Sequence, residues 1–518
     1  RKMSFMNAVK NTLNEDFNYS VTENGALGYR TSGKELVDLN FAVSSMRGMS
    51  EENIYNKFTK AYFEDKMMAL RWLFFARDVR GGLGERRLFR AILKNMAKDD
   101  VDVVKHLAPL VSEYGRYDDL WCLFGTGVDG VILDIIKKQL TDDIANMADN
   151  KPVSLLAKWL PSVNASSAKT KMDARYICKN LGMTEREYRK TLSSLRSYID
   201  IVESKMSAKK WGDIKYETVP SRANLIYNGA FLRNDEERRR EYLSKLEKGE
   251  TKINAGTLFP HDIVHKYSST TGWYGGVGKY DAALESLWKA LPDTVNECGN
   301  TIVVADGSGS MCCNVGGNSR VTALEVANAL AIYFAEHSSG DFKDKYITFS
   351  SRPQLVDFSQ CDSLRDKLRV AYSHSECSNT NIEKVFDLIL TTAVNGHMKQ
   401  EDMPKNVLII SDMEFDSCAT CGGNGYGLNR PNAKLFKVIK KRFEDAGYQM
   451  PRLVFWNVNS RTGTIPVKEN DLGVALVSGF STNVCKMVMS GKTDPYECLV
   501  ETLMSDRYDA VEAALKNS

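Results

Sequence analysis

The chain has 518 residues and carries 69 Lys and Arg against 66 Asp and Glu, so its formal net charge is only +3 at pH 7. This length favours two or three domains over a single core, and so small a charge means that a polyanionic partner would have to bind a local basic patch. No apolar stretch approaches the roughly 18 residues that a membrane-spanning helix needs, and the N-terminal residues lack the apolar core of a signal peptide.

The cysteines indicate a reducing compartment. There are eleven, an odd number, and their spacing follows no disulfide framework. Such a set is typical of free thiols in a cytosolic protein. We therefore expect a cytoplasmic protein without structural disulfides.

The first region, residues 1–49, is a polar, Asn-rich arm that we expect to pack on the helical domain that follows. Residues 50–295 carry helical periodicity. Apolar residues recur at i, i+3 and i+4 in 67–75 and again in 87–93, and further amphipathic segments continue to residue 248. No alternating, strand-like run competes with them. Successive helix pairs without strands predict a HEAT-like α-solenoid, although no fixed sequence period is visible.

Basic residues concentrate near the end of this helical region. Neighbouring Lys and Arg side chains would release counterions from a phosphate backbone, and the ring of Trp211 or Tyr216 would stack on a base. The acidic run Asp235-Glu236-Glu237 interleaves with the arginines, so a solvated helix face is the alternative interpretation. The candidate RNA contacts are Lys209, Lys210, Trp211, Arg222, Arg233, Arg238, Arg239 and Arg240.

The pattern changes near residue 295, and residues 296–518 form the third predicted region. Apolar strands are expected near 301–305, 345–349, 353–358, 405–410, 452–457 and 472–477. They alternate with helices near 321–337, 381–392 and 432–446. Strands that alternate with helices predict a doubly wound parallel sheet.

The end of the first of these strands carries the strongest chemical signal. The run 301–305 leads into Asp306, and Ser308 and Ser310 follow at alternate positions in a glycine-rich loop. A buried parallel strand delivers its last carboxylate to the carboxyl edge of the sheet, where open α/β sheets bind ligands. One carboxylate and two hydroxyls suit a hard divalent cation such as Mg²⁺. A Gly/Ser turn without a metal is the simpler alternative.

The spacing Asp-x-Ser-x-Ser resembles the metal-ion-dependent adhesion site of von Willebrand factor A domains. In that domain type, a Thr and a second Asp from later loops join the same metal. The resemblance assigns these roles to Thr380, which precedes a helical stretch, and to Asp412, which follows the buried run 405–410. It thus implies a site for Mg²⁺ or Mn²⁺ formed by Asp306, Ser308, Ser310, Thr380 and Asp412. An A-type fold that has lost its metal is the alternative.

Cysteines near the same edge raise a second question. Cys312 and Cys313 follow the two serines, and Cys418 and Cys421 form a Cys-x-x-Cys pair after Asp412. Four thiols would suit Zn²⁺, but two adjacent cysteines chelate a tetrahedral ion poorly. We therefore expect free thiols and no zinc.

Three segments of the helical region, residues 77–86, 114–121 and 203–221, point to one family. They resemble Ro autoantigen-type proteins, in which a HEAT-like helical ring (the TROVE module) precedes an A domain. The order of the modules is the same, and the bacterial and viral members are the most similar. The resemblance implies binding of structured non-coding RNA outside the ring and of single-stranded RNA ends in its hole, with the A domain closing the ring.

These features together predict a non-enzymatic RNA-binding scaffold, a ribonucleoprotein component for small non-coding or misfolded RNA. An enzyme is not indicated, because the sequence has no Gly-x-Ser-x-Gly elbow and no acidic pair with a suitable partner. Two alternatives stay open. In one, the metal site captures a carboxylate of a partner protein. In the other, which is weaker, the same metal serves a nuclease.

Overall fold

A computed structural model of the chain describes residues 5–268, 276–295, 300–316, 319–417, 435–468, 470–488 and 491–516. The chain forms two compact units. The sheet unit comprises Arg1–Ala69 and Leu258–Leu503, and the helical unit comprises Leu70–Thr257 and Met504–Ser518. The domain edges expected at residues 50 and 296 do not coincide with the edges of these units. Within the described residues, no helix is long and apolar enough to cross a membrane.

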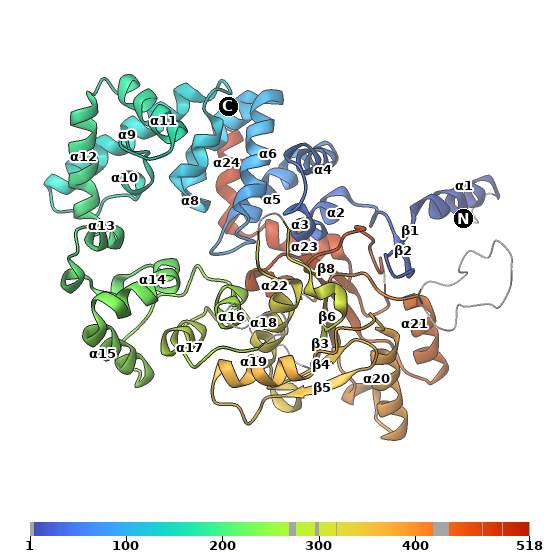
Figure 1. The fold of residues 1–518 in the computed structure, drawn as a ribbon. Coiled ribbons are helices and arrows are strands. Elements are labelled where there is room, and N and C mark those ends of the chain that lie inside the picture. Colours follow the sequence, from blue (N-terminus) through green and yellow to red (C-terminus); the bar gives the residue numbers. More distant parts are fainter. Residues whose placement is uncertain are drawn as a thin grey trace. The chain divides into compact units, whose positions relative to one another are not determined.

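The helical unit consists of helices joined by turns, and its described residues contain no strand (Figure 1). Local sequence sets the helix starts. The Thr184 hydroxyl accepts from the Glu187 amide while the Glu187 carboxylate accepts from the Thr184 amide, which caps α12 at both donors. The helices are α6 (Arg86–Asp99), α7 (Val101–Leu107), α8 (Val111–Tyr114), α9 (Asp129–Ala148), α10 (Leu156–Trp159), α11 (Ala168–Asn180), α12 (Glu185–Tyr198), α13 (Val202–Ser207), α14 (Ser221–Asn234), α15 (Glu236–Glu247) and α24 (Asp509–Lys516). The helix α5 (Lys66–Arg77) carries the chain from the sheet unit into the helical unit.

The last residues of the chain belong to the helical unit, although the sequence suggests that they end the α/β domain. Asp78 is 1% exposed, and its carboxylate accepts from Arg507 Nη2 at 2.7 Å and from the Tyr508 hydroxyl at 3.0 Å. The turn after Asp78 needs glycine at position 82, because a Cβ there would lie 1.9 Å from the carbonyl oxygen of Phe75. An ion pair between the buried carboxylate of Asp78 and the exposed Arg507 therefore holds the chain just before α24.

The sheet unit contains a six-stranded sheet in the order β5-β4-β3-β6-β7-β8. All neighbouring strands are parallel except β4 and β5, which are antiparallel. The strands are β3 (Thr301–Asp306), β4 (Lys345–Phe349), β5 (Gln354–Asp357), β6 (Asn406–Ser411), β7 (Arg452–Asn457) and β8 (Val474–Ser478). The predicted fold class, a helix-rich region together with a mostly parallel α/β domain, is confirmed.

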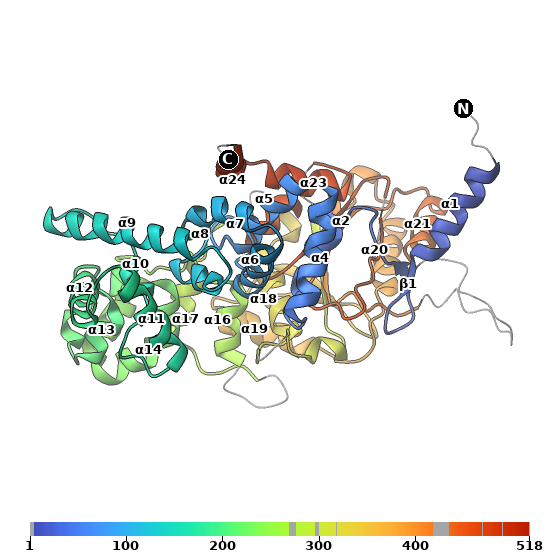
Figure 2. The same ribbon diagram turned by 90° about the horizontal axis from the view of Figure 1, so that it is seen from above.

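Helices cover both faces of this sheet. The helices α18 (Ala323–Glu336) and α19 (Leu364–Ser373) lie on one side, and α20 (Glu383–Asn395) and α21 (Leu435–Asp445) on the other (Figures 1 and 2). Every residue of α18 from Ala323 to Ala335 is buried, as expected for a helix enclosed by protein. The part of the unit after residue 257 also contains α16 (Pro260–Ser268), α17 (Ala282–Lys289), α22 (Cys485–Val488) and α23 (Pro495–Leu503).

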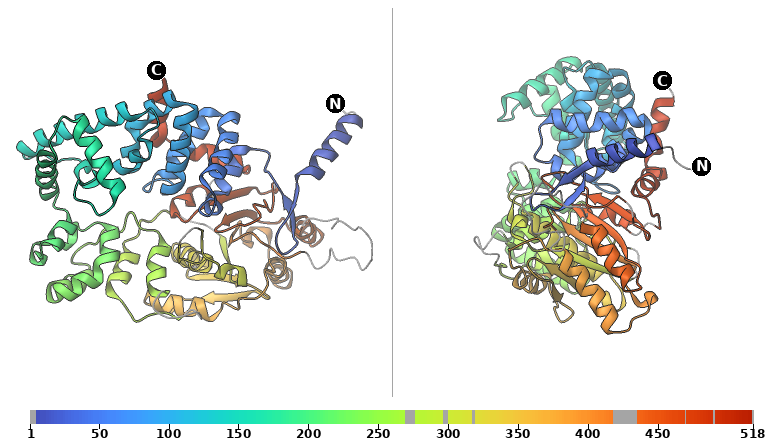
Figure 3. Two further views of the ribbon diagram at one scale, coloured as in Figure 1. Left: turned by 45° about the horizontal axis from the view of Figure 1, so that its top comes forward. Right: turned by 90° about the vertical axis from the view of Figure 1, so that its right-hand side faces the viewer.

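The N-terminal arm has structure of its own and belongs to the sheet unit, with which it forms hydrogen bonds. Asn457 Nδ2 donates to the Phe41 carbonyl at 2.7 Å, and Tyr29 exchanges two backbone hydrogen bonds of 2.8 Å with Ile465. The helix α1 extends away from the hairpin that follows it (Figure 3). The elements of the arm are α1 (Phe5–Asn18), β1 (Tyr19–Val21), β2 (Leu27–Tyr29), α2 (Glu35–Phe41) and α3 (Val43–Met46), and α4 (Glu51–Glu64) follows.

The Asp78 ion pair predicts where the C-terminal helix loosens. Asp78→Asn should lower the free energy of local opening around α24 by roughly 2 kcal/mol, since it removes charge-assisted hydrogen bonds to a buried carboxylate. Amide hydrogen exchange at residues 508–516 measures this. The control is Asp102→Asn, whose exposed pair with Lys105 should contribute almost nothing. Unchanged exchange in Asp78→Asn would show that the pair does not hold the helix.

Candidate functional site

The candidate metal residues gather where the strand order of the sheet reverses. β3 and β6 are adjacent and parallel, and the chain continues outward from them in opposite directions, to β4 and to β7. Open α/β sheets bind ligands at this switch point, beyond the carboxyl ends of the strands. Asp306 is the last residue of β3, and Asp412 follows the last residue of β6. The parallel register therefore brings the two carboxylates to the same edge.

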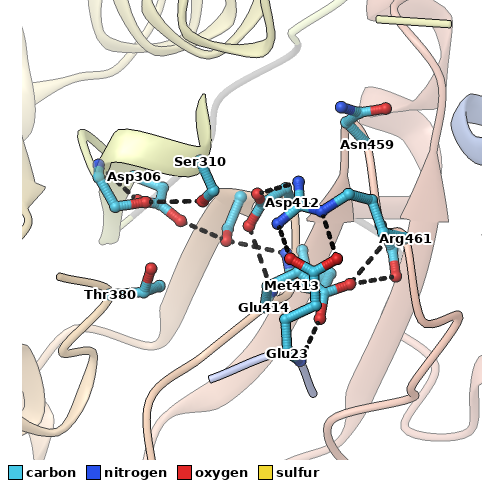
Figure 4. A network of polar contacts seen from close by, with 12 residues as sticks. Glu23, Asp306, Ser310, Thr380, Asp412, Met413, Glu414, Asn459 and Arg461 are labelled. Carbon is cyan, nitrogen blue, oxygen red and sulfur yellow. Dashed lines mark hydrogen bonds and ion pairs between the residues drawn. The ribbon is translucent and has the colours of Figure 1, made fainter. Parts of the chain in front are cut away.

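Asp306 is 1% exposed and is fixed by its neighbours. Its Oδ1 accepts from the Ser308 amide at 2.9 Å, and its Oδ2 accepts from the Ser411 hydroxyl at 2.6 Å. The Ser308 and Ser310 hydroxyl oxygens lie 3.2 Å apart. The hydroxyl groups of the two alternate serines therefore lie next to each other, and Figure 4 shows Ser310 at this end of the sheet.

Asp412 is fully buried and is paired with a cation from a distant loop. Its Oδ1 accepts from the Glu414 amide at 3.2 Å, and its Oδ2 lies 3.0 Å from Nη1 of Arg461. The Arg461 guanidinium also forms an ion pair with Glu23 at 2.7 Å (Figure 4). Each carboxylate oxygen of Asp412 therefore already has a hydrogen-bond donor.

Thr380 lies on the loop before α20 and is 1% exposed. Two backbone hydrogen bonds join its loop to the Asp306 loop: Gly309 donates to the Ser378 carbonyl at 3.0 Å, and Cys377 donates to the Gly307 carbonyl at 3.1 Å. The Thr380 hydroxyl accepts from Asn24 Nδ2 at 3.4 Å. The structure thus brings all five predicted metal residues to one end of the sheet, from three loops.

The electrostatics of the two carboxylates fit a bound cation. Burial, together with the charge of Asp412, raises the pKa of Asp306 to about 7. Burial also raises the pKa of Asp412, although hydrogen bonds from Ser310 and Arg461 oppose that shift. Two buried carboxylates that cannot both ionise at low cost are stabilised by a divalent ion, which binds their charged forms. The donors are all oxygens, the ligand type that Mg²⁺ and Mn²⁺ prefer.

Three functional neighbours escaped the sequence analysis: Arg461, Glu414 and Glu23. Glu414 is fully buried, and its carboxylate accepts from the backbone amides of Arg461 at 2.8 Å, of Thr462 at 2.9 Å and of Glu23 at 2.9 Å. The sequence gives a weak sign of this role. Glu414 follows a buried apolar strand by only a few residues, and acidic side chains are rarely buried unless they are paired. Arg461 and Glu23 give none, because their partners lie hundreds of residues away.

The cysteine prediction is answered in part. Cys418 and Cys421 lie outside the described residues. Cys312 and Cys313 are exposed and form no disulfide, and the absence of zinc stays a prediction. Across the described ranges, no three or more His, Cys, Asp and Glu side chains are arranged to hold a metal ion. The candidate site is not a group of this kind, because it has only two carboxylates and its other three side chains are hydroxyls.

Only some of the candidate RNA-binding residues in the basic segment of the helical unit are exposed. Arg239 is fully buried, its guanidinium 4.9 Å from the centre of the Tyr216 ring, and its Nε donates to Asn228 Oδ1 at 3.0 Å. Its assignment as an RNA contact is therefore wrong, because no phosphate reaches it. Tyr216 is 3% exposed, and Trp211 packs against the same core through the Phe231 ring. The Tyr216 ring is therefore not placed to stack on a base, whereas the Trp211 ring is only partly buried.

The other candidate cations are accessible. Arg238 is half-exposed, but it donates to the carbonyls of Trp211 and Ile214 and so fastens the turn beneath it. Arg240 is exposed and pairs with Glu236 on its own helix. The remaining candidates are all exposed: Lys209, Lys210, Arg222 and Arg233.

A groove of about 590 Å³ lies in the same unit, lined by α12, α13 and the turn after α13. Two of its cations are committed to the protein: Arg196 donates to the carbonyls of Ala157 and Leu160, and Lys205 pairs with Asp200. Arg189 and Lys210 also line the groove and are exposed. Hydrogen bonds and an ion pair thus hold two cations in the wall of the groove, and two others are exposed to solvent.

Comparisons with known proteins name no activity. A domain of unknown function (DUF7788) matches residues 300–515, and a second domain of unknown function (DUF2828) matches residues 167–301. The two matches meet at the start of β3. An uncharacterized protein of Acanthamoeba polyphaga mimivirus is 29% identical over 526 residues, which cover 94% of this chain and 87% of that protein. The crystal structure of the Deinococcus radiodurans Ro (RSR) protein is similar with a TM-score of 0.40 and 14% identity, covering 88% of this chain and 99% of that one.

The raised pKa of Asp306 predicts a pH-dependent stability. The stability that this carboxyl contributes is present below its ordinary pKa near 4 and is lost as the pH rises through about 7, where the folded protein acquires a buried charge. Asp306→Asn removes that charge. Without metal, the variant should therefore melt several degrees above the native chain at pH 8, and the difference should shrink at pH 5.

Thermal unfolding in the presence of a chelator at the two pH values measures this difference. The control is Asp357→Asn, since a hydrogen bond from Ser359 lowers the pKa of that exposed carboxyl. Its replacement should give no gain at pH 8. Equal melting of Asp306→Asn and the native chain at both pH values would contradict the proposed burial of charge.

Proposed function

We propose that the protein is a non-enzymatic RNA-binding scaffold of the cytoplasm, whose helical unit binds the phosphate backbone and whose sheet unit holds a divalent cation. One observation carries the RNA proposal. Residues 168–252 contain 20 Lys and Arg against 13 Asp and Glu, although the whole chain has a net charge of only +3. Such a concentration of positive charge is the electrostatic footprint of a nucleic-acid site.

Two of these basic residues lie on the exposed face of α14. Residues 222, 226, 229 and 233 are exposed, whereas 223, 224, 225, 228 and 231 are buried. The exposed positions follow the i, i+4, i+7, i+11 spacing of one helix face. Arg222 and Arg233 therefore stand on the same face, about 16 Å apart along the helix axis. That distance spans a few consecutive phosphates of an RNA strand.

The groove beside α12 suits a single strand better than a duplex. It presents Arg189 and Lys210 to solvent, and its wall carries the hydroxyls of Ser193, Ser197 and Ser204. Lys and Arg contact phosphates, and hydroxyls contact phosphate or sugar oxygens. A pocket of about 590 Å³ has room for a nucleotide or two. The resemblance to the Ro family implies the same two kinds of RNA, structured RNA and single-stranded ends, but it places the single-stranded ends in the hole of the ring and not in this groove.

The RNA proposal predicts a selective loss of affinity. Replacing both Arg222 and Arg233 with Gln should weaken binding of a hairpin RNA with a single-stranded 3′ tail about tenfold per lost phosphate contact near 0.1 M salt. The log–log salt slope should fall by about one unit for each contact. Fluorescence anisotropy over a salt series measures both quantities.

A matched control separates this site from bulk charge. Arg240→Gln with Lys245→Gln removes the same charge from exposed residues that already pair with Glu236 and Glu241 on α15. This variant should keep most of the affinity and the salt slope. Equal losses in the two double variants would mean non-specific attraction, and no RNA binding by the native chain at low salt would reject the proposal.

We further propose that Asp306, Ser308, Ser310, Thr380 and Asp412 hold Mg²⁺ or Mn²⁺. The support is the convergence of five oxygen side chains on one edge of the sheet and the cost of two buried carboxylates without a cation. A hard divalent ion would neutralise these carboxylates and polarise a ligand oxygen. Mg²⁺ takes six oxygens and usually keeps water among them, so an acidic side chain of a partner protein would fit the last position.

Asp306→Ala should abolish Mg²⁺ and Mn²⁺ binding in calorimetry and leave RNA affinity nearly unchanged, since the helical unit keeps its cations. The control Asp357→Ala, an exposed carboxylate of the same unit, should retain metal binding. Unchanged divalent affinity in Asp306→Ala would refute the metal site. Loss of RNA binding in the same variant would move the RNA to the metal end of the sheet.

A further inference from the structure

Two thiols face each other at the metal end of the sheet. The sulfur atoms of Cys312 and Cys377 lie 3.5 Å apart, and both residues are exposed. Cys312 is the last residue of the short 3-10 turn that begins at Gly309. It lies two residues after Ser310. Cys377 lies three residues before Thr380. The pair therefore joins the loop that carries Ser308 and Ser310 to the loop that carries Thr380.

Exposed cysteines in the described part of the chain occur only at this end of the sheet. Cys178, Cys485 and Cys498 are buried, and Cys122 and Cys361 are half-buried. The third exposed thiol, Cys313, is adjacent to Cys312 in sequence. A bond between adjacent cysteines would close a small, strained ring, because disulfides favour Cα separations well above the 3.8 Å between neighbours. Cys377 is therefore the natural partner of Cys312.

The backbone around the pair is already in place for a bond. The Cys377 amide donates to the Gly307 carbonyl at 3.1 Å, and the Gly309 amide donates to the Ser378 carbonyl at 3.0 Å. Cys377 has a positive φ of 48°, which is rare outside glycine and is held by these contacts. Since a disulfide has a sulfur–sulfur distance of about 2.05 Å, the sulfur atoms must approach by only about 1.5 Å.

We propose that Cys312 and Cys377 form a reversible oxidation site, in which a disulfide clamps two of the three loops that carry the candidate metal ligands. The oxidant is a hydroperoxide. One thiolate attacks a peroxide oxygen, the O–O bond breaks, and a sulfenic acid forms; with hydrogen peroxide the leaving oxygen becomes water. The second thiol then attacks the sulfenic sulfur, the S–S bond forms, and a further water leaves. Two thiols lose two electrons, and the peroxide gains them.

The clamp has a direct consequence for the cation, and this part rests on the metal site proposed above. In the reduced protein, hydrogen bonds join the serine loop to the Thr380 loop, and local opening of those bonds has to be reversed when the ion binds. A cross-link between positions 65 residues apart restricts that freedom before binding. Oxidised protein should therefore bind Mg²⁺ about three- to tenfold more tightly than reduced protein.

The experiment begins with the full reduced chain, which is treated with a small excess of hydrogen peroxide, alkylated and mapped by mass spectrometry without reduction. The expected product is a peptide pair linked through Cys312 and Cys377 that a thiol reductant separates. Cys313→Ser should retain the link, whereas Cys312→Ser and Cys377→Ser should lose it. Cys361→Ser, which changes a half-buried thiol of the same unit, is the control and should also retain it.

Alkylation of both Cys312 and Cys377 after oxidation, or cross-links distributed equally over Cys313, would overturn the oxidation site. Calorimetry with Mg²⁺ on the reduced and oxidised native chain then tests the coupling. Equal affinities would overturn the clamp. If neither form binds Mg²⁺ or Mn²⁺, the metal proposal fails, and the peptide map alone decides whether Cys312 and Cys377 are an oxidation site.

Discussion

The sheet unit depends on the accommodation of two carboxylates buried at the ends of neighbouring parallel strands. Asp306 and Asp412 are placed there by the register of β3 and β6, and like charges in a poorly solvated site repel strongly. The surroundings offset that repulsion on one side only. Arg461 lies against Asp412, whereas Asp306 receives hydrogen bonds from Ser308 and Ser411 and, within the described ranges, pairs with no Lys or Arg. The proposed metal ion would neutralise this second carboxylate.

The same constraint explains why the N-terminal arm is part of the sheet unit. The guanidinium that neutralises Asp412 is itself held by Glu23 of the arm, and buried Glu414 binds the Glu23 amide and the loop at Arg461 at once. Between the two acids stands Met413, buried and at a positive φ of 64°. A non-glycine residue in that conformation is a local strain, and strain of this kind gathers at functional sites.

The features that could be predicted from the sequence are those that a local pattern of residues determines. A β-branched run that ends in Asp reveals both the strand and its carboxylate, so Asp306 and Asp412 were predictable together with the sheet. The ion pair of Arg461 with Glu23 was not, because it joins positions 438 residues apart. Arg239 is a different case. It lies three residues before Tyr242 and four before Leu243, which are buried in α15, so helical periodicity places it on the same buried face. Its assignment as an RNA contact considered only its charge.

The small net charge of the chain hides two surfaces with opposite preferences. Residues 168–252 hold 20 Lys and Arg against 13 Asp and Glu, which leaves 49 against 53 in the rest of the chain. Salt screens exposed charges over about 10 Å at 0.1 M ionic strength, so a ligand responds to the nearest patch and not to the total. In the proposed function, a polyanion therefore binds at the face of α14. The end of the sheet, where Asp306, Asp412 and Glu414 are buried, would bind a cation first and an anion only through that cation.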